Sequence, residues 1–281
     1  MCEFCVKHGE GKKWYLQAKN YSDDLLSDLS RRRFIQEFLS HPQALARDVQ
    51  RIERLDKAPR FLRGLIGRII TRKMKRVHFG QIVPLEDVEK IFEFVTSIVR
   101  VACICRQASL GQEKRYCYGI SLAAHGGRFA EIVRGLDGSY LTGPDNQGLE
   151  VLNKEEALSA FRAHEREGLC HSVWTFHTPF IGGICNCDRS DCMALRCTVS
   201  HAVPVMFRGE YVARVDPDRC RGCRECLRLC QFGGLSYSAA TQKAVIDQRW
   251  CYGCGVCRTA CKQEAISLTE RSSVPAVAHL W

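Results

Sequence analysis

The last quarter of the chain contains one cysteine pattern twice. Cys-x-x-Cys-x-x-Cys-x-x-x-Cys occurs at residues 220–230 and again at residues 251–261, an offset of 31 residues. Eight thiols this close together are typical of metal binding. The flanking apolar residues repeat with the same offset, which predicts two copies of a unit made of a strand, a cysteine loop, a short helix and a second strand. The corresponding positions are Val215 and Ile246, and Leu235 and Ile266.

This pattern resembles that of the bacterial two-cluster ferredoxins. In that family the fourth cysteine of each motif binds the cluster held by the other motif, so the resemblance implies two 4Fe-4S clusters with crossed ligands. The implied ligands are Cys220, Cys223, Cys226 and Cys261 for one cluster, and Cys251, Cys254, Cys257 and Cys230 for the other. We expect Gly222, Gly253 and Gly255 to let backbone amides approach the sulfurs closely.

Two positions depart from the ferredoxin pattern. Gln231 and Lys262 follow the fourth cysteines, where the family has proline. Proline is not a ligand, so we expect cluster assembly to be unaffected. Positive charges in or beside the loops should raise the reduction potentials. The alternative to iron-sulfur binding is a pair of zinc ribbons, which requires two CxxC pairs separated by a longer loop and leaves the CxxxC step unexplained.

Six of the ten remaining cysteines predict a third metal site. We expect the glycine-rich segment 182–188 to be a turn in which two thiols can reach one metal. At least four of the six should hold a further iron-sulfur cluster or another metal, and the alternative is that they are buried free thiols. With a CxCR segment at 103–106 and a CNC segment at 185–187 ahead of the ferredoxin pattern, the middle region as a whole loosely resembles an uncharacterised family of 4Fe-4S proteins from anaerobes, which implies no reaction. The six are Cys103, Cys105, Cys117, Cys185, Cys187 and Cys192.

The other four cysteines give weaker indications. Cys2 and Cys5 form a CxxC step close to His8. These are only three donors, so a metal there would need another ligand, and incidental thiols in a flexible terminus are the alternative. Cys170 and Cys197 have no partner at a typical spacing and are expected to be core residues.

The N-terminal third is basic and is predicted to be helical. Residues 1–83 hold 18 of the 41 Lys and Arg but 9 of the 31 Asp and Glu. We expect helices from Ser22 to about His41, from Pro42 to Lys57 and over residues 60–77. The last of these has an apolar face and seven Arg or Lys. It could be the solvated outer face of a core helix, or it could dock an acidic redox partner, an anionic membrane surface or nucleic acid; among the functional options we favour the acidic partner.

Together these features predict an α+β protein. The expected parts are a basic helical region at 1–83, a cysteine-rich α+β domain at 84–208, a ferredoxin domain at 209–271 and a tail at 272–281. The start of the chain lacks the apolar core of a signal peptide, and the longest apolar stretch, 91–105, is too short and too charged to span a membrane. Thiols in this number then indicate metal ligands in a reducing cytoplasm.

The function expected from the sequence is one-electron transfer through two 4Fe-4S clusters, by an electron-transfer protein or a subunit of a redox complex in low-potential anaerobic metabolism. A first alternative is a reductase or reductive activator, whose middle domain holds a catalytic or relay cluster fed by the ferredoxin module. A second is a redox-sensing regulatory protein. No triad, nucleotide-binding glycine loop or flavin fingerprint is visible, so the sequence leaves open whether the protein is an enzyme.

Overall fold

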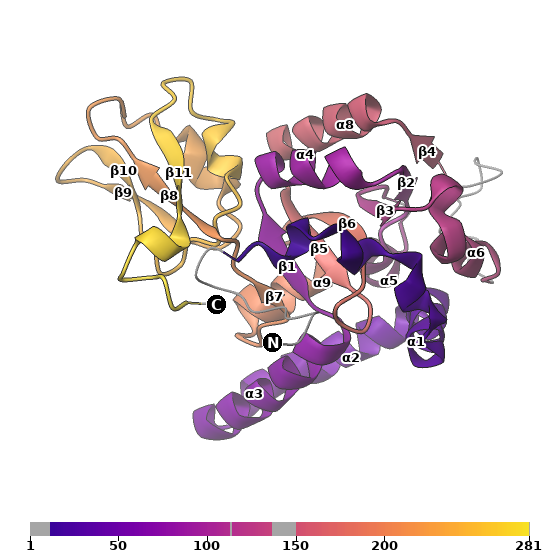
Figure 1. Ribbon diagram of the computed structural model, residues 1–281. Helices are drawn as coiled ribbons and strands as arrows, with labels where there is room; N and C mark the ends of the chain where they lie inside the picture. Colours follow the sequence, from indigo (N-terminus) through magenta and orange to yellow (C-terminus); the bar gives the residue numbers. More distant parts are fainter. Residues whose placement is uncertain (1–11, 113, 137–149, 281) are drawn as a thin grey trace.

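The computed structural model describes residues 12–112, 114–136 and 150–280, and its fold is α+β, as predicted. A seven-stranded sheet lies between two groups of helices, and a smaller β-rich module packs beside it (Figure 1). Among the described residues no helix is both long enough and apolar enough to cross a membrane. The α-helices are α1 (Leu29–Ser40), α2 (Pro42–Arg54), α3 (Arg60–Val77), α4 (Leu85–Phe94), α5 (Ile104–Leu110), α6 (Gly127–Arg134), α8 (Lys154–Arg166) and α9 (Met193–Leu195).

The large sheet is antiparallel at every pairing except that of β1 with β7. Its strand order is β4-β2-β3-β6-β5-β1-β7. Because strands distant in the sequence are neighbours, this order brings the cysteine-bearing strands β3, β6 and β5 side by side at its centre. The strands are β1 (Gly80–Val83), β2 (Ser97–Val101), β3 (Cys117–Ser121), β4 (Glu150–Leu152), β5 (Cys170–Thr175), β6 (Ile181–Cys187) and β7 (Met206–Phe207).

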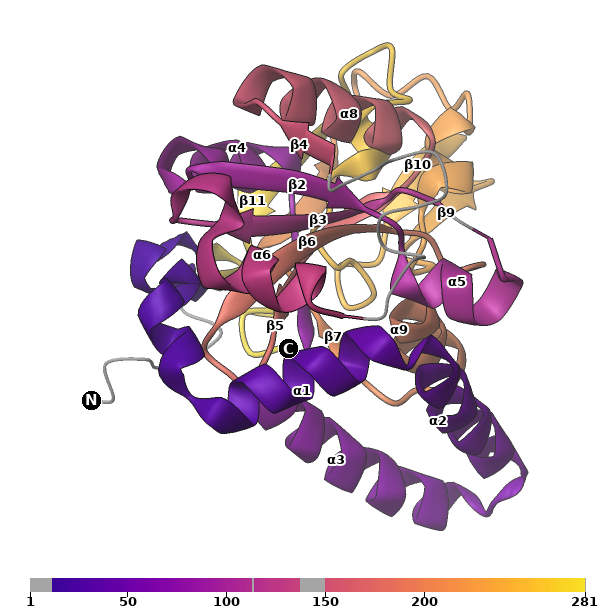
Figure 2. The same ribbon diagram turned by 90° about the vertical axis from the view of Figure 1, so that its right-hand side faces the viewer.

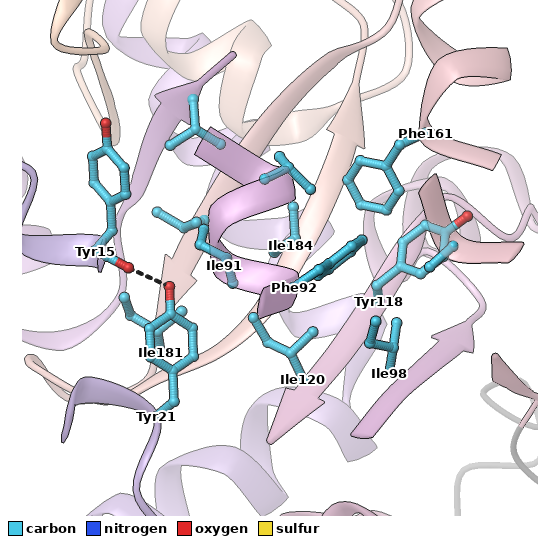
Figure 3. Packing of buried hydrophobic residues seen from close by; sticks show 14 of the residues in the cluster. Tyr15, Tyr21, Ile91, Phe92, Ile98, Tyr118, Ile120, Phe161, Ile181 and Ile184 are labelled. Carbon is cyan, nitrogen blue, oxygen red and sulfur yellow. Dashed lines mark hydrogen bonds between the residues drawn. The ribbon is translucent and has the colours of Figure 1, made fainter. Parts of the chain in front are cut away.

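One face of this sheet packs against α4 and α8. Side chains alternate along each strand, so Tyr118 and Ile120 of β3 and Ile184 of β6 share this face. Phe92 of α4 and Phe161 of α8 complete the cluster (Figure 3). The aromatic residues Trp14, Tyr15 and Tyr21, from the short 3-10 helices η1 (Trp14–Leu16) and η2 (Ala18–Tyr21), belong to the same cluster.

The opposite face is covered by α1, α2, α5, α6 and α9 (Figure 2). Ile35 of α1, Ile104 of α5 and Phe129 of α6 form a second cluster with Phe176 and Phe180. This face also carries the thiols of the three central strands. The sheet therefore has an aromatic face toward α4 and α8 and a thiol-bearing face toward α5 and α9.

Three α-helices lie in the N-terminal region, as predicted, but short 3-10 helices change the bounds of the first two. Ser22 caps the 3-10 helix η3 (Asp23–Ser27), whereas α1 begins after Asp28, whose carboxylate accepts the Ser30 amide at 2.8 Å. Two helices thus replace the one expected from Ser22 to His41. The second helix ends in the 3-10 helix η4 (Leu55–Lys57), and α3 has the predicted bounds.

Helix α3 is packed less completely than its apolar periodicity suggests. Phe61, Leu65 and Ile69 are 78%, 56% and 59% exposed, and Gly67 is its one buried residue. Ile66, Ile70 and Met74 of its apolar face line a cavity beside α2. The expectation of a core helix with a solvated outer face is therefore wrong for the first half of α3, because much of its apolar face lies in solvent.

The C-terminal module follows the sequence repeat. Its strands are β8 (Tyr211–Val215), β9 (Leu235–Ser238), β10 (Lys243–Ile246) and β11 (Ile266–Glu270). They form two antiparallel pairs, β8 with β11 and β9 with β10. A 3-10 helix occupies the same place in each half, η7 (Glu225–Leu229) and η8 (Val256–Arg258). Both halves thus have the elements that the offset of 31 residues predicts.

Candidate metal centres

The first candidate centre, called here the outer quartet, contains Cys220, Cys223, Cys226 and Cys261. All four line one small pocket between the two halves of the C-terminal module. Cys261 is the fourth cysteine of the second motif, and the other three belong to the first motif. The structure therefore places Cys261 beside the first three cysteines of the other motif. Cys223 is exposed, whereas Cys220 and Cys226 are buried, and burial raises the pKa of the Cys226 thiol to about 11.

The second candidate centre, the inner quartet, contains Cys230, Cys251, Cys254 and Cys257. The charges of Cys251, Cys254 and Cys230 all act on the Cys257 thiol, whose pKa is raised mainly by burial. Cys226 of the outer quartet acts on the same thiol, so the two quartets are neighbours. Backbone amides point at one sulfur of each quartet: Ala213 N lies 3.3 Å from Cys251 Sγ, and Ala265 N lies 3.3 Å from Cys261 Sγ.

Glycines in the two cysteine loops are required for a second reason besides the predicted one, and the Gly253 amide does hydrogen-bond the Cys251 thiol. Gly222 and Gly253 have φ of +69° and +75°, and a Cβ on either would lie 2.1 Å from a backbone oxygen, that of Gln242 or Tyr211. The close neighbour is therefore a carbonyl of an adjoining strand or turn. Arg224, at the position equivalent to Gly255, adopts a φ of +67° without being glycine.

Gln231 connects the C-terminal module to the rest of the protein. Its side-chain amide donates to Gly168 O at 2.8 Å and accepts from Arg189 N at 2.9 Å. A proline side chain could form neither bond. The equivalent Lys262 is exposed. The departure from the ferredoxin pattern at residue 231 thus has a structural role that the sequence did not indicate.

Two of the basic residues beside the cysteine loops, Arg258 and Arg228, are paired with carboxylates. Arg258 forms a two-pronged pair with Glu86 of α4, and Arg228 pairs with Glu225 at 3.0 Å. The guanidinium of Arg224 lies over the Tyr237 ring, 3.8 Å from its centroid. Their effect on reduction potentials should therefore be smaller than the count of positive charges suggests.

The six cysteines of the middle region, called here the six-cysteine group, lie together against the thiol-bearing face of the large sheet. Cys117 of β3 and Cys185 of β6 are directly paired, and their sulfurs are 3.2 Å apart. Cys103 precedes the first residue of α5, Cys105 lies in its first turn, and Cys192 precedes α9. The expectation of a turn at 182–188 is wrong: Cys185 and Cys187 lie on strand β6, where residues two apart share one face.

Contacts between the thiols follow a continuous order. Cys185 contacts Cys117, Cys117 contacts Cys103, and Cys103 contacts Cys105. Cys105 in turn contacts Cys192, which contacts Cys187, so the order begins and ends on β6. Hydrogen bonds from two neighbouring thiols hold the pKa of both Cys103 and Cys192 well below its ordinary value.

Arg106 supplies a buried positive charge beside this group. Its guanidinium lies 3.7 Å from Cys103 Sγ and pairs with Asp188 and, at 3.4 Å, with Asp191. It also lies over the Tyr116 ring at 4.3 Å. The side chain is 2% exposed, so its attraction to any negative charge on the thiols is little screened by water.

All six thiols line one wall of an apolar cavity of about 520 Å³. The other walls come from α1, α2 and α3 and from the sheet, including Leu39, Val49, Met74 and Phe176. Within the described residues no set of three or more His, Cys, Asp or Glu side chains is already placed to hold a metal ion. Cys2, Cys5 and His8 lie outside the described residues.

Cys170 is a residue that the sequence analysis assigned only to the core. It is fully buried, pairs with Cys187 across β5 and β6, and belongs to the hydrophobic cluster that joins the sheet to the C-terminal module. Charges on Cys254 and on Cys192 both act on its thiol. No spacing rule could have found this residue, because only the register of β5 against β6 places it there.

Comparison with known proteins finds one short similarity. A stretch of 61 residues, 22% of this chain, is 30% identical to the archaeal-type glutamate synthase [NADPH] of Thermotoga maritima, and equally to that of Thermotoga sp. strain RQ2. It spans 12% of the length of each of those proteins. No family model matches the chain.

Proposed function

We propose that this protein transfers single electrons through two 4Fe-4S clusters, one on the outer quartet and one on the inner quartet. The observation that carries the proposal is the position of Cys261 beside the cysteines of the first motif and of Cys230 beside those of the second. This crossed arrangement is the one that two-cluster ferredoxins use. The short similarity to two glutamate synthases is compatible with a redox role.

The residues present fit such clusters. Each quartet offers four thiols in largely apolar surroundings, with a backbone amide aimed at one sulfur. When bound, each cluster would supply a one-electron redox couple. The exposed Cys223 puts the outer quartet at the surface, where a partner can approach, whereas the inner quartet faces the large sheet. Electrons would thus enter at the outer quartet and move inward, or leave by the reverse path.

Pairs of alanine variants test the crossed ligation. After anaerobic purification, Cys223→Ala and Cys261→Ala should perturb the same cluster, so the double variant should give the same electron paramagnetic resonance spectrum as either single variant. Cys223→Ala with Cys230→Ala should perturb both clusters. The reverse result would show uncrossed motifs, and a wild-type chain purified without iron, or with zinc at these cysteines, would overturn the proposal.

We also propose that α3 docks an acidic redox protein. The helix carries seven Arg or Lys and no acidic residue, and Phe61, Leu65 and Ile69 are exposed beside these charges. Positive charge would steer an acidic surface toward the helix, and the apolar side chains would supply contacts once water is displaced. The two features together on one helix support a protein partner.

Salt dependence and charge reversal test this docking. With an acidic ferredoxin as the probe, electron transfer should slow steeply as ionic strength rises, and Arg72→Glu should slow it further at low salt. Arg166→Glu is the matched control, because it reverses an exposed charge on α8, across the sheet from α3. A rate independent of salt, or α3-dependent binding to anionic lipid vesicles without any effect on the probe reaction, would contradict the proposal.

A further inference from the structure

We infer that the six-cysteine group holds a third iron-sulfur cluster, bound by at least four of its thiols at the wall of the apolar cavity and connected to the inner quartet through the packing around Cys170. The inference goes beyond the two clusters proposed above. Its connection to the inner quartet rests on that proposal, whereas the binding of the cluster itself does not.

The distribution of the thiols favours a cluster over a single ion. A tetrahedral zinc site gathers four ligands at about 2.3 Å from one point. Here six thiols form a chain of neighbouring contacts that begins and ends on β6. They come from β3, β6, α5 and the start of α9. A cubane spreads its four thiolates over four irons, so ligands on several elements can each reach a different iron.

The cavity provides the room that a cluster requires. Its volume of about 520 Å³ greatly exceeds what one ion needs, and the thiols lie along one wall. Cys105 and Cys185 are partly accessible although they lie deep in the protein, because they face this space. The remaining walls are mainly aliphatic and aromatic, with Asp48, Arg51, Lys73 and His78 among them, and the apolar part would limit the access of water to the sulfurs.

Arg106 places a positive charge beside such a centre, although its pairs with Asp188 and Asp191 offset much of that charge. Thiolates are the form of cysteine that binds metal, and several buried thiolates require compensation. The Arg106 guanidinium lies 3.7 Å from Cys103 Sγ and is held by Asp188 and Asp191, so it is already in place before a cluster binds.

The third centre lies in series with the other two. Cys187 and Cys192 share a hydrophobic cluster with Cys170, and Cys230 and Cys254 of the inner quartet pack against the same cluster. One electron would leave the reduced inner cluster and enter the third, with no bond made or broken. The C-terminal module would then serve as the input of a centre enclosed in the sheet domain, and the cavity beside that centre would be the place where an apolar acceptor could meet it.

Metal analysis of the full chain, reconstituted anaerobically with iron and sulfide, tests the inference. The wild type should bind about twelve irons per chain. The triple variant Cys103→Ala, Cys117→Ala and Cys185→Ala, which keeps only three of the six thiols, should bind about eight while both ferredoxin-type signals persist. Cys197→Ala is the matched control, since Cys197 lines the same cavity without belonging to the six-cysteine group, and it should keep about twelve. Because the triple variant could fail to fold, the wild type is also titrated for a third reducible paramagnetic signal, which should couple magnetically to the inner cluster and lose that coupling in Cys254→Ala.

The outcomes separate this inference from the proposed function. About eight irons in the wild type, with or without one zinc or a Cys117–Cys185 disulfide, would overturn the third cluster and leave the two-cluster proposal intact. Far fewer than eight would overturn the two-cluster proposal. Twelve irons without magnetic coupling would overturn the series arrangement.

Discussion

The quartets and the six-cysteine group differ in how their thiols come together. In the C-terminal module the chain spacing itself gathers three cysteines of each quartet, with short strand pairs and small side chains around them. In the sheet domain the thiols come from β3, β6, α5 and the start of α9, and a large aromatic core on the other face holds those elements in register. On the proposed function, metal would organise the C-terminal module, whereas the fold itself gathers the six-cysteine group.

Removing metal should show the largest difference between the two regions. Without iron and sulfide, hydrogen exchange at β8 to β11 should become fast, because small metal-bound modules gain much of their folding free energy from the metal. The amides of β3, β5 and β6 should stay protected. Equal loss of protection in both regions, measured by mass spectrometry after chelation, would show that the sheet domain also depends on metal.

A substitution at Gly253 should break the C-terminal module alone. In Gly253→Ala the new Cβ would lie 2.1 Å from Tyr211 O, so β8 or the cysteine loop has to move and the inner cluster should be lost. Gly233→Ala is the control, since Gly233 has the same φ of +75° but no atom within 4 Å. Iron content should fall only in the first variant. Equal iron in both would mean that the loop tolerates the clash.

Loss of Arg106 should destabilise the sheet domain. Arg106→Gln removes the cation shared by Asp188 and Asp191 and should lower the free energy of unfolding by about 3 kcal/mol. Arg51→Gln removes an exposed pair with Asp48 and should cost about 0.5 kcal/mol or less. Denaturant titration of both variants measures the difference, and similar costs would contradict the buried role of Arg106.

Low pH should lower the stability of the folded protein through His78, which lines the cavity. Burial, offset in part by the hydrogen bond to Thr175 O, lowers the pKa of this histidine from 6.5 to about 4. The unfolded chain therefore binds a proton more readily between these values, and stability falls as pH drops from about 6.5 toward 4, by roughly 2 kcal/mol between pH 7 and pH 5. In His78→Phe this part of the pH dependence should vanish. The exposed His41→Gln serves as the control, and an unchanged profile in both would refute the assignment.

The smallest effect is expected at the junction of the two regions. Gln231→Ala loses two hydrogen bonds to Gly168 and Arg189 and should cost about 1 to 2 kcal/mol, seen as faster exchange in the residues around them. Lys262→Ala changes the equivalent residue of the repeat, which is exposed, and should leave exchange unchanged. If both variants behave alike, Gln231 does not hold the junction.

Local patterns gave correct predictions where neighbouring residues decide the structure. The bounds of α3 followed from apolar spacing, and the elements of the C-terminal repeat followed from one offset. The division of the first helix at Asp28 was missed, because the Ser22 and Asp28 caps look equally good in sequence. The predicted domain boundaries and ligand assignments stay predictions.

The sequence by itself determined the α+β class, the two cysteine motifs and their grouping into a repeated module, because these depend on residues only a few positions apart. Only the tertiary structure decided that Cys117 faces Cys185, that Cys170 lies between the six-cysteine group and the inner quartet, and that half of the apolar face of α3 is in solvent. Strand order and register join residues dozens of positions apart, and their choice depends on the packing of the whole sheet rather than on any local pattern.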